Sequence, residues 1–218
     1  MCIGVDTSAS PGGLAEADAC ALADVAREQG FCSATLLLGA AATRAGVYSQ
    51  LRAAAAECRS GDLFLMTFSG HGGRRPVQAA RPCAGGASRS GLRGVWVLFD
   101  GSLDDAEMHE ALAAFRPGVR VLVISDSCNG GVPAAMPSNV VASVLVLSAC
   151  REDQYADAAG LPGHFTTALL REWHRGQRVS YRHFYESVAA GMPAYQQPTY
   201  YWVGERDERF EAQAPFTI

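Results

Sequence analysis

Two apolar segments of this chain run into residues that can carry nucleophilic catalysis. Residues 63–68 lead into Ser-Gly-His-Gly-Gly, which contains His71, and residues 119–124 lead into Ser-Asp-Ser-Cys-Asn-Gly-Gly, which contains Cys128. A free thiol is only a few per cent ionised at neutral pH, and a neighbouring imidazole accepts its proton and later protonates the leaving amine. If the two segments are adjacent parallel strands, His71 and Cys128 meet at one edge of a sheet.

Glycines flank both residues and allow backbone N–H groups to approach a substrate closely. The N–H groups of Gly72 and Cys128 are therefore the candidates for an oxyanion hole. Each residue also has an ordinary structural interpretation. A cysteine at a strand end is often a small buried apolar side chain, and a single histidine is often a surface residue or a hydrogen-bonded core residue.

Strands and helices alternate around these motifs. Apolar runs predict strands at 1–5, 34–38, 63–68, 96–99, 119–124, 140–147 and 199–203. Helical periodicity predicts helices at 14–29, 47–58, 103–115, 165–174 and 180–190. Continuous apolar strands that alternate with helices predict an α/β fold with a mostly parallel sheet covered on both faces. In such sheets the chemistry lies beyond the carboxyl ends of the strands.

Local signals predict how two of these helices begin, end and pack. In the first helix, Gly30 is the stop signal, and one face is expected to be apolar. That face consists of Leu14, Ala17, Ala21, Leu22 and Val25. For the helix after residue 102, Ser102 is the expected N-cap and Asp105 its capping-box partner.

The two motifs resemble those of a known peptidase family. Residues 68–72 are similar to the histidine motif of caspases and metacaspases, and residues 124–131 resemble their cysteine motif, commonly Asp-Ser-Cys-His-Ser-Gly in metacaspases. The separation of 57 residues (128 − 71) is close to the ~50 expected for caspases. One departure is visible, because residues 129–131 are Asn-Gly-Gly in place of His-Ser-Gly.

This resemblance, to bacterial metacaspases of the orthocaspase type, covers nearly the whole chain. It implies a single caspase-like domain over 1–218, with a mostly parallel six-stranded sheet flanked by helices on both faces. It also implies a cysteine endopeptidase that works through a Cys-His dyad and an acyl-enzyme. The competing hypothesis is an inactive caspase-fold scaffold or binding module, which retention of both Cys128 and His71 argues against.

The residue two before the nucleophile bears on specificity. Asp126 and Cys128 face the same side of a strand, and an acid there attracts a basic P1 residue and repels an acidic one. By resemblance, caspases that cut after Asp have Gln at this position, whereas metacaspases have Asp and cut after Arg or Lys. The resemblance also places a second pocket acid after the first strand, at Asp18. The alternative for Asp18 is an acid in the first turn of a helix.

Three further acids are weaker candidates. Asp153 follows another predicted strand and either lines the same cleft or is a solvated loop charge. The calcium site of metacaspases resembles Asp104 and Asp105, 24 and 23 residues before Cys128, which are equally explained as helix-start acids. The family's further acid falls at Ala135, and calcium takes six to eight oxygen ligands. We therefore expect no cofactor and no calcium requirement.

Residues 74–94 predict a long loop rich in Gly, Ser, Pro and Arg. It contains five arginines, namely Arg74, Arg75, Arg81, Arg89 and Arg93. If the enzyme cuts after arginine, this loop is a candidate for self-processing. The alternative is an exposed surface loop that tolerates change.

The bulk composition limits the partners. The chain has 218 residues, of which 49% are hydrophobic and 18% charged, which indicates a globular domain. A net charge of -4 argues against nucleic acid, so we expect a protein or peptide substrate. Seven scattered cysteines, no signal-peptide pattern and no apolar run near the ~20 residues of a membrane span predict a cytoplasmic protein without membrane contact.

Overall fold

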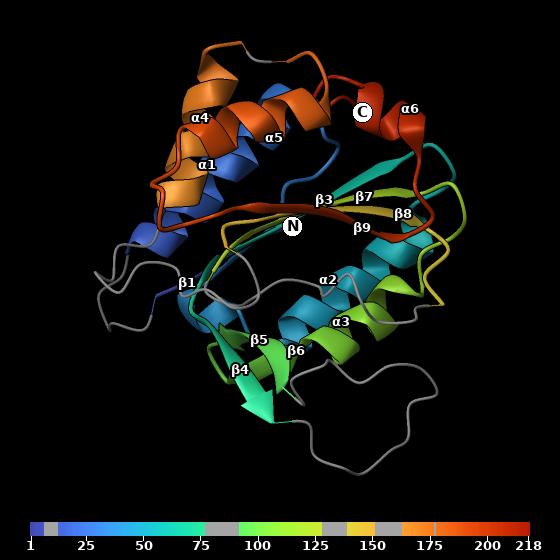
Figure 1. The fold of residues 1–218 in the computed structure, drawn as a ribbon. Helices are drawn as coiled ribbons and strands as arrows, with labels where there is room; N and C mark the ends of the chain where they lie inside the picture. The colour runs from blue at the N-terminus through green and yellow to red at the C-terminus, as the bar shows by residue number, and fades with distance from the viewer. Residues whose placement is uncertain (7–12, 77–91, 128–138, 151–162, 177) are drawn as a thin grey trace.

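A central sheet of six strands organises the chain (Figure 1). The computed structural model describes residues 1–6, 13–76, 92–127, 139–150, 163–176 and 178–218. The strand order is β2-β1-β3-β7-β8-β9. The strands are β1 (Cys2–Val5), β2 (Leu36–Leu38), β3 (Leu63–Gly70), β7 (Arg120–Asp126), β8 (Ser143–Ser148) and β9 (Thr199–Gly204). All neighbours pair in parallel except β8 and β9, which confirms the predicted sheet.

Helices cover both faces of this sheet (Figure 1). One face carries α1 (Leu14–Glu28), α4 (His164–His174), α5 (Tyr181–Ala190) and the short α6 (Glu208–Ala212). The other carries α2 (Arg44–Glu57) and α3 (Asp105–Leu112), and a short 3-10 turn, η1 (Gly39–Ala41), leads into α2. The α/β class is therefore confirmed. Within the described residues, no helix has the length and apolar character needed to cross a membrane.

The two faces of the sheet bury two separate cores, and β7 contributes to both. Val121 and Val123 pack toward α2 and α3, whereas Leu122 and Ile124 pack toward α1, α4 and α5. Successive strand residues point to opposite faces, so a strand buried on both faces must be apolar at every position. That requirement explains why β7 reads as an uninterrupted apolar run in the sequence.

A second, smaller sheet lies beside the α2 and α3 layer (Figure 1). Its three antiparallel strands are β4 (Gly72–Pro76), β5 (Leu92–Leu98) and β6 (Gly101–Asp104). The prediction of a loop over 74–94 and a strand only at 96–99 was therefore wrong at both ends of the loop. β4 consists only of Gly, Arg and Pro, and in β5 the first residue is followed by Arg93 and Gly94, so these segments lack the alternation that identifies a strand from sequence. Residues 77–91 lie outside the described part of the chain.

Helix α1 buries Leu22 and Val25 as predicted, but the rest of its buried face differs from the prediction. Its buried side chains are Ala15, Ala19, Leu22, Ala23, Val25 and Ala26, whereas Leu14 and Ala17 are exposed. The reason is a close approach to β1, where a Cβ on Gly4 would lie 2.5 Å from the carbonyl oxygen of Ala15. The helix turns its small alanines toward the sheet there. The predicted stop at Gly30 agrees with its positive φ of 81°.

Helix α3 begins later than predicted. Ser102 belongs to β6, and the N-cap is Asp104, whose side chain accepts from the Glu107 N–H at 2.9 Å. Glu107 in turn accepts from the Asp104 N–H at 2.9 Å, which completes a capping box. The Ser102–Asp105 capping box was therefore wrong, because pairing of residues 101–104 with β5 delays the helix.

Replacement of Gly4 tests the close approach of α1 to β1. Gly4→Ala places a methyl group within 2.5–2.9 Å of the α1 backbone, and we expect a loss of about 1–3 kcal/mol in the free energy of unfolding. Gly73→Ala is the matched control, since its Cβ would meet only a Val95 methyl at 3.6 Å. Urea unfolding followed by circular dichroism measures both. Equal stability of the two variants would contradict the packing described here.

Candidate active site

The parallel pairing of β3 with β7 brings the two chemical motifs to one edge of the sheet. Ser69 stands opposite Asp126 in the register, so His71 and Cys128 each follow two residues beyond that pair. His71 is exposed, and its carbonyl accepts the N–H of Val97 at 2.9 Å. Cys128 lies outside the described residues, so its distance from His71 and its part in the oxyanion hole stay predictions.

Gly70 is needed where β3 turns into His71. Its φ is 157°, and a Cβ there would lie 2.9 Å from the carbonyl oxygen of Val5. That distance is shorter than a van der Waals contact and involves backbone that has no freedom to move aside. A glycine therefore allows the chain to pass β1 closely as it delivers His71 to the sheet edge.

The Gly72 N–H points away from the small sheet. Gly72 stands opposite Trp96, and the flanking bond from Val97 N–H to the His71 carbonyl marks this as a non-hydrogen-bonded pair. In such a pair the N–H and C=O groups face outward from the partner strand. This orientation is the one that an oxyanion donor at Gly72 requires, and the role itself stays a prediction.

The backbone that precedes Cys128 is anchored on several sides. Ser125 Oγ accepts from Trp96 Nε1 at 3.2 Å and lies 2.9 Å from Ser127 Oγ. The Ser127 carbonyl accepts from the Cys150 thiol at 3.2 Å. Trp96 also stacks on Phe68, with ring centroids 4.5 Å apart. The small sheet, β3 and β7 are thus joined immediately before both motifs.

The structure brings Asp18 and Asp126 together. Asp18 Oδ2 accepts from Ser69 Oγ at 2.8 Å, and Ser69 pairs in register with Asp126. The Asp126 carboxylate is buried and its Oδ2 accepts from the Thr166 N–H at 2.8 Å, in the first turn of α4. Two acids from α1 and β7 therefore share one region at the end of the strand that leads to Cys128.

Burial makes both carboxylates hard to ionise. Loss of hydration raises the pKa of Asp18 to about 7, and the charges of Asp126 and Asp6 add to this, while the Ser69 hydrogen bond opposes it. Burial likewise raises the pKa of Asp126, against the hydrogen bonds from Thr166. Both acids therefore favour their protonated forms in a region with little water, and a cationic group that bound there would favour their ionisation.

Asp6 orients the helix that carries Asp18. Its two carboxylate oxygens accept the N–H groups of Ala15 and Glu16, each at 3.2 Å. Gly13, the N-cap, has no side chain, and a Cβ there would clash with the Asp6 carboxyl group at 2.2 Å. Asp6, the residue directly after β1, therefore caps the first turn of α1.

The remaining candidate acids lie elsewhere or outside the described residues. Asp104 and Asp105 lie at the junction of β6 and α3, where they contact Arg75 and Arg93. Asp153 lies outside the described part of the chain. Within the residues that the structure describes, no group of three or more His, Cys, Asp or Glu side chains could hold a metal ion.

Sequence reasoning missed the side chains that support the site. Ser69, Thr166 and Trp96 were not candidates, although they hold Asp18, Asp126 and Ser125. The position of Ser69, two residues before His71 on a strand, is a local signal that it faces the same edge. Thr166 and Trp96 come from distant segments, and no local pattern connects them to the motifs.

Comparison with known proteins agrees with this geometry. A family model for the caspase domain matches residues 8–208. The solved structure of protein GSU0716 from Geobacter sulfurreducens is 33% identical and covers 100% of this chain and 97% of its own, with a TM-score of 0.82. The Drosophila initiator caspase Dronc is 12% identical, covers 99% of this chain and 81% of its own, and has a TM-score of 0.61, which indicates a shared fold alone.

Curated relatives match a shorter segment. Metacaspase-1B of Aspergillus fumigatus and Metacaspase-1B of Neosartorya fischeri are each 32% identical over 100 residues. That segment is 44% of this chain and 23% of each relative. The matched segment therefore spans less than a quarter of those proteins.

The raised pKa of Asp18 predicts a specific pH dependence of stability. An unfolded Asp titrates near ~3.9, so the folded state holds its proton more tightly, and stability falls as pH rises from about 4 to about 7. Asp18→Asn removes this loss, and its stability relative to the native protein should increase across that window. Urea midpoints at several pH values measure it. Asp24→Asn, on the exposed face of α1, is the control, and identical pH profiles for both variants would contradict the burial of Asp18.

Proposed function

This chain belongs to the caspase domain family, and we propose that it is a cysteine endopeptidase that cleaves peptide bonds after arginine or lysine. The family makes it a peptidase domain that acts on protein substrates. The nucleophile, its base and the P1 preference are our assignments. They rest on the motifs around His71 and Cys128 and on the acids grouped beside them.

The proposed chemistry uses one thiol and one imidazole. Cys128 transfers its proton to His71, and the thiolate sulfur attacks the scissile carbonyl carbon. The oxyanion accepts hydrogen bonds from the N–H groups of Gly72 and Cys128. The C–N bond breaks as His71 protonates the leaving amine, and water then attacks the thioester to release the carboxylic acid and restore the thiol.

The observation that carries the P1 assignment is the convergence of Asp18 and Asp126. Without a cation nearby, burial favours the protonated forms of both acids. A P1 guanidinium or ammonium reverses this, because a buried positive charge stabilises the carboxylates as it binds. An acidic P1 residue would add a third negative charge to the same region, so the pocket disfavours it.

Fixed donors orient the two carboxylates before substrate arrives. The Ser69 hydroxyl holds an oxygen of Asp18, and the Thr166 N–H holds an oxygen of Asp126. Both donors belong to regular elements, β3 and α4, so the acids need little reorganisation to receive a cation. A planar guanidinium can donate hydrogen bonds to two carboxylates at once, in addition to its charge attraction to them. This geometry favours arginine over lysine at P1.

A reducing compartment such as the cytoplasm suits this chemistry, because the nucleophile must remain a thiol. The five cysteines that the structure describes are all free of disulfides. Three of them, Cys20, Cys32 and Cys58, are at least partly accessible. Free accessible thiols are typical of intracellular proteins.

A peptide library that varies P1 tests the proposed function. We expect turnover after Arg and Lys, none after Asp, and complete loss in Cys128→Ala. The decisive measurement is the ratio of kcat/KM for Arg over citrulline, a neutral analogue of arginine, because titration of the catalytic pair cancels in that ratio. The ratio should rise with pH through about 7 as the acids ionise.

Isosteric variants link that ratio to the pocket. Asp126→Asn keeps an oxygen that accepts from Thr166 but removes the charge, and it should lower the ratio by about tenfold or more, which is ~1.4 kcal/mol. Asp18→Asn should flatten the pH dependence. Preference for Asp at P1 would overturn the pocket assignment. No turnover of any peptide would favour an inactive scaffold.

Self-processing is a further prediction of cleavage after arginine. Arg75 and Arg93 are engaged by acids of the small sheet, and Arg81 is followed by Pro82, so we expect a cut after Arg89, which lies outside the described residues. Mass spectrometry of the purified protein should find two fragments, whereas Cys128→Ala should remain intact. Identical intact masses for the two proteins would end this proposal.

A further inference from the structure

Two arginines stand directly opposite each other in the small sheet. Arg75 of β4 pairs in register with Arg93 of β5, so their side chains leave the same face. Like charges directly opposite each other destabilise a strand pair. The observed register therefore requires negative charge on that face.

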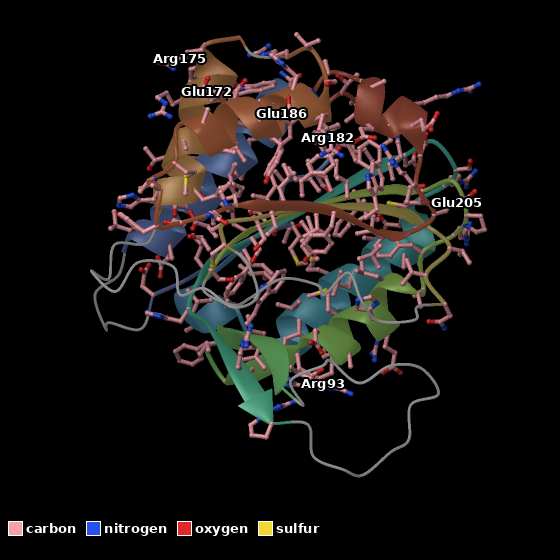
Figure 2. The ribbon with its side chains drawn as sticks, in the orientation of Figure 1. Arg93, Glu172, Arg175, Arg182, Glu186 and Glu205 are labelled. Atoms are coloured by element: carbon pink, nitrogen blue, oxygen red, sulfur yellow. The ribbon has the colours of Figure 1, made fainter. Side chains whose placement is uncertain are left out.

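Asp104 and Asp105 supply that negative charge. Arg75 Nη2 forms a close ion pair with Asp104 Oδ2. Arg93 lies between the two acids, with Nη1 3.8 Å from Asp104 Oδ1 and Nε 4.0 Å from Asp105 Oδ1. Figure 2 shows Arg93 at the small sheet, beside the start of α3. The carboxylates are buried, with side chains 8% and 4% exposed, so their charges are poorly screened by water.

A third ion pair continues the cluster. Glu107, the capping-box partner of Asp104, accepts from Arg44 Nη2 at 2.5 Å. Three carboxylates thus face three guanidinium groups from α2, β4 and β5. The described cluster is electrically balanced, and a divalent cation would leave it with two excess positive charges.

The pair does not fit a calcium ion. Three of the four carboxylate oxygens already accept donors, which are the Glu107 N–H and Arg75 on Asp104 and the Gly94 N–H on Asp105. The fourth, Asp105 Oδ1, accepts no hydrogen bond from the residues that the structure describes and lies 4.0 Å from Arg93 Nε. The other side chains that line the adjoining pocket are apolar: Val95, Trp96, Leu103 and Met108. Six to eight oxygen ligands are therefore not at hand among these residues.

We propose that Arg75 and Arg93 act as a built-in cation at Asp104 and Asp105: their guanidinium groups supply the positive charge that a bound calcium ion would otherwise provide. The small sheet therefore forms without calcium. The sheet leads directly to the catalytic region, because β4 begins at the residue after His71. Trp96 of β5 also contacts Phe68 and Ser125. Arg75 and Arg93 are accordingly positioning residues for His71.

The first test needs only the native protein. After dialysis against chelator, thermal melts and calorimetric titration with calcium should show no saturable binding and no rise in Tm at millimolar calcium. A saturable rise in Tm that Asp104→Asn/Asp105→Asn abolishes would overturn the proposal, whatever the other variants do.

The second test removes the built-in cation. Arg75→Gln/Arg93→Gln leaves two buried acids unneutralised, so we expect a lower Tm in chelator and a new, saturable rise in Tm with calcium. Arg75→Lys/Arg93→Lys keeps the charges and should remain insensitive to calcium. Arg74→Gln is the matched control, because Arg74 is exposed on the opposite face of β4.

If the double variant does not fold, the single variant Arg93→Gln takes its place. Calcium should raise its Tm as well, and absence of any calcium response in a folded Arg93→Gln would overturn the proposal. Refolding of the double variant by calcium would support it.

An activity measurement connects the ion cluster to His71 and rests on the proposed peptidase function. Native kcat/KM for an Arg peptide should be equal with chelator and with calcium, and the double variant should be activated by calcium ~5-fold or more. Dependence of the native activity on calcium would overturn the proposal. Binding and melting results as expected without activity in the native protein would refute the peptidase function and leave the cation assignment intact.

Discussion

The parallel register of β3 with β7 is the constraint on which the rest of the site depends. It places Ser69 opposite Asp126, and in the sequence His71 and Cys128 each follow two residues after that pair. Both strands are buried on both faces, so their apolar residues lock the register from two sides. A slip of one residue would move each strand's whole apolar set to the wrong face. The register that buries the apolar core therefore also aligns the two motifs.

Buried charge at the end of that sheet is held in two different ways. Asp18 and Asp126 have hydroxyl and amide donors, and His164 lies near Asp126, but burial still raises the pKa of each. Asp104 and Asp105 are also buried, and burial raises the pKa of Asp105 to about 6, but guanidinium groups lie beside both acids and Arg93 opposes that rise. In the proposed function, the first pair binds the cationic P1 side chain of a substrate. Arginines of the protein itself already neutralise the second pair. The protein thus uses one pair of carboxylates for the proposed binding of substrate and another pair for structural ion pairs.

The small sheet connects these two regions. Trp96 lies on β5 between the ion cluster and the catalytic edge, where it stacks on Phe68 and donates to Ser125. Its neighbours on the same sheet include Gly72, whose N–H faces away from β5, and Arg93. Any change that opens this sheet therefore disturbs the ion cluster, the His71 turn and the backbone before Cys128 together.

The sequence by itself determined the sheet, its covering helices and the motifs at its edge, because apolar runs and short motifs are local properties. It also identified Asp18 and Asp126 as neighbours through resemblance to a family. The tertiary structure decided which face of α1 is buried, since the contact at Gly4 admits only small residues. It decided the start of α3 and the partners of Asp104 as well, because both depend on how β4 and the first residues of β5 pair, and the Gly, Arg and Pro residues there carry no periodic signal. Ion pairs such as Arg75 with Asp104 join residues 29 apart in the chain, and only the fold brings such charges within reach.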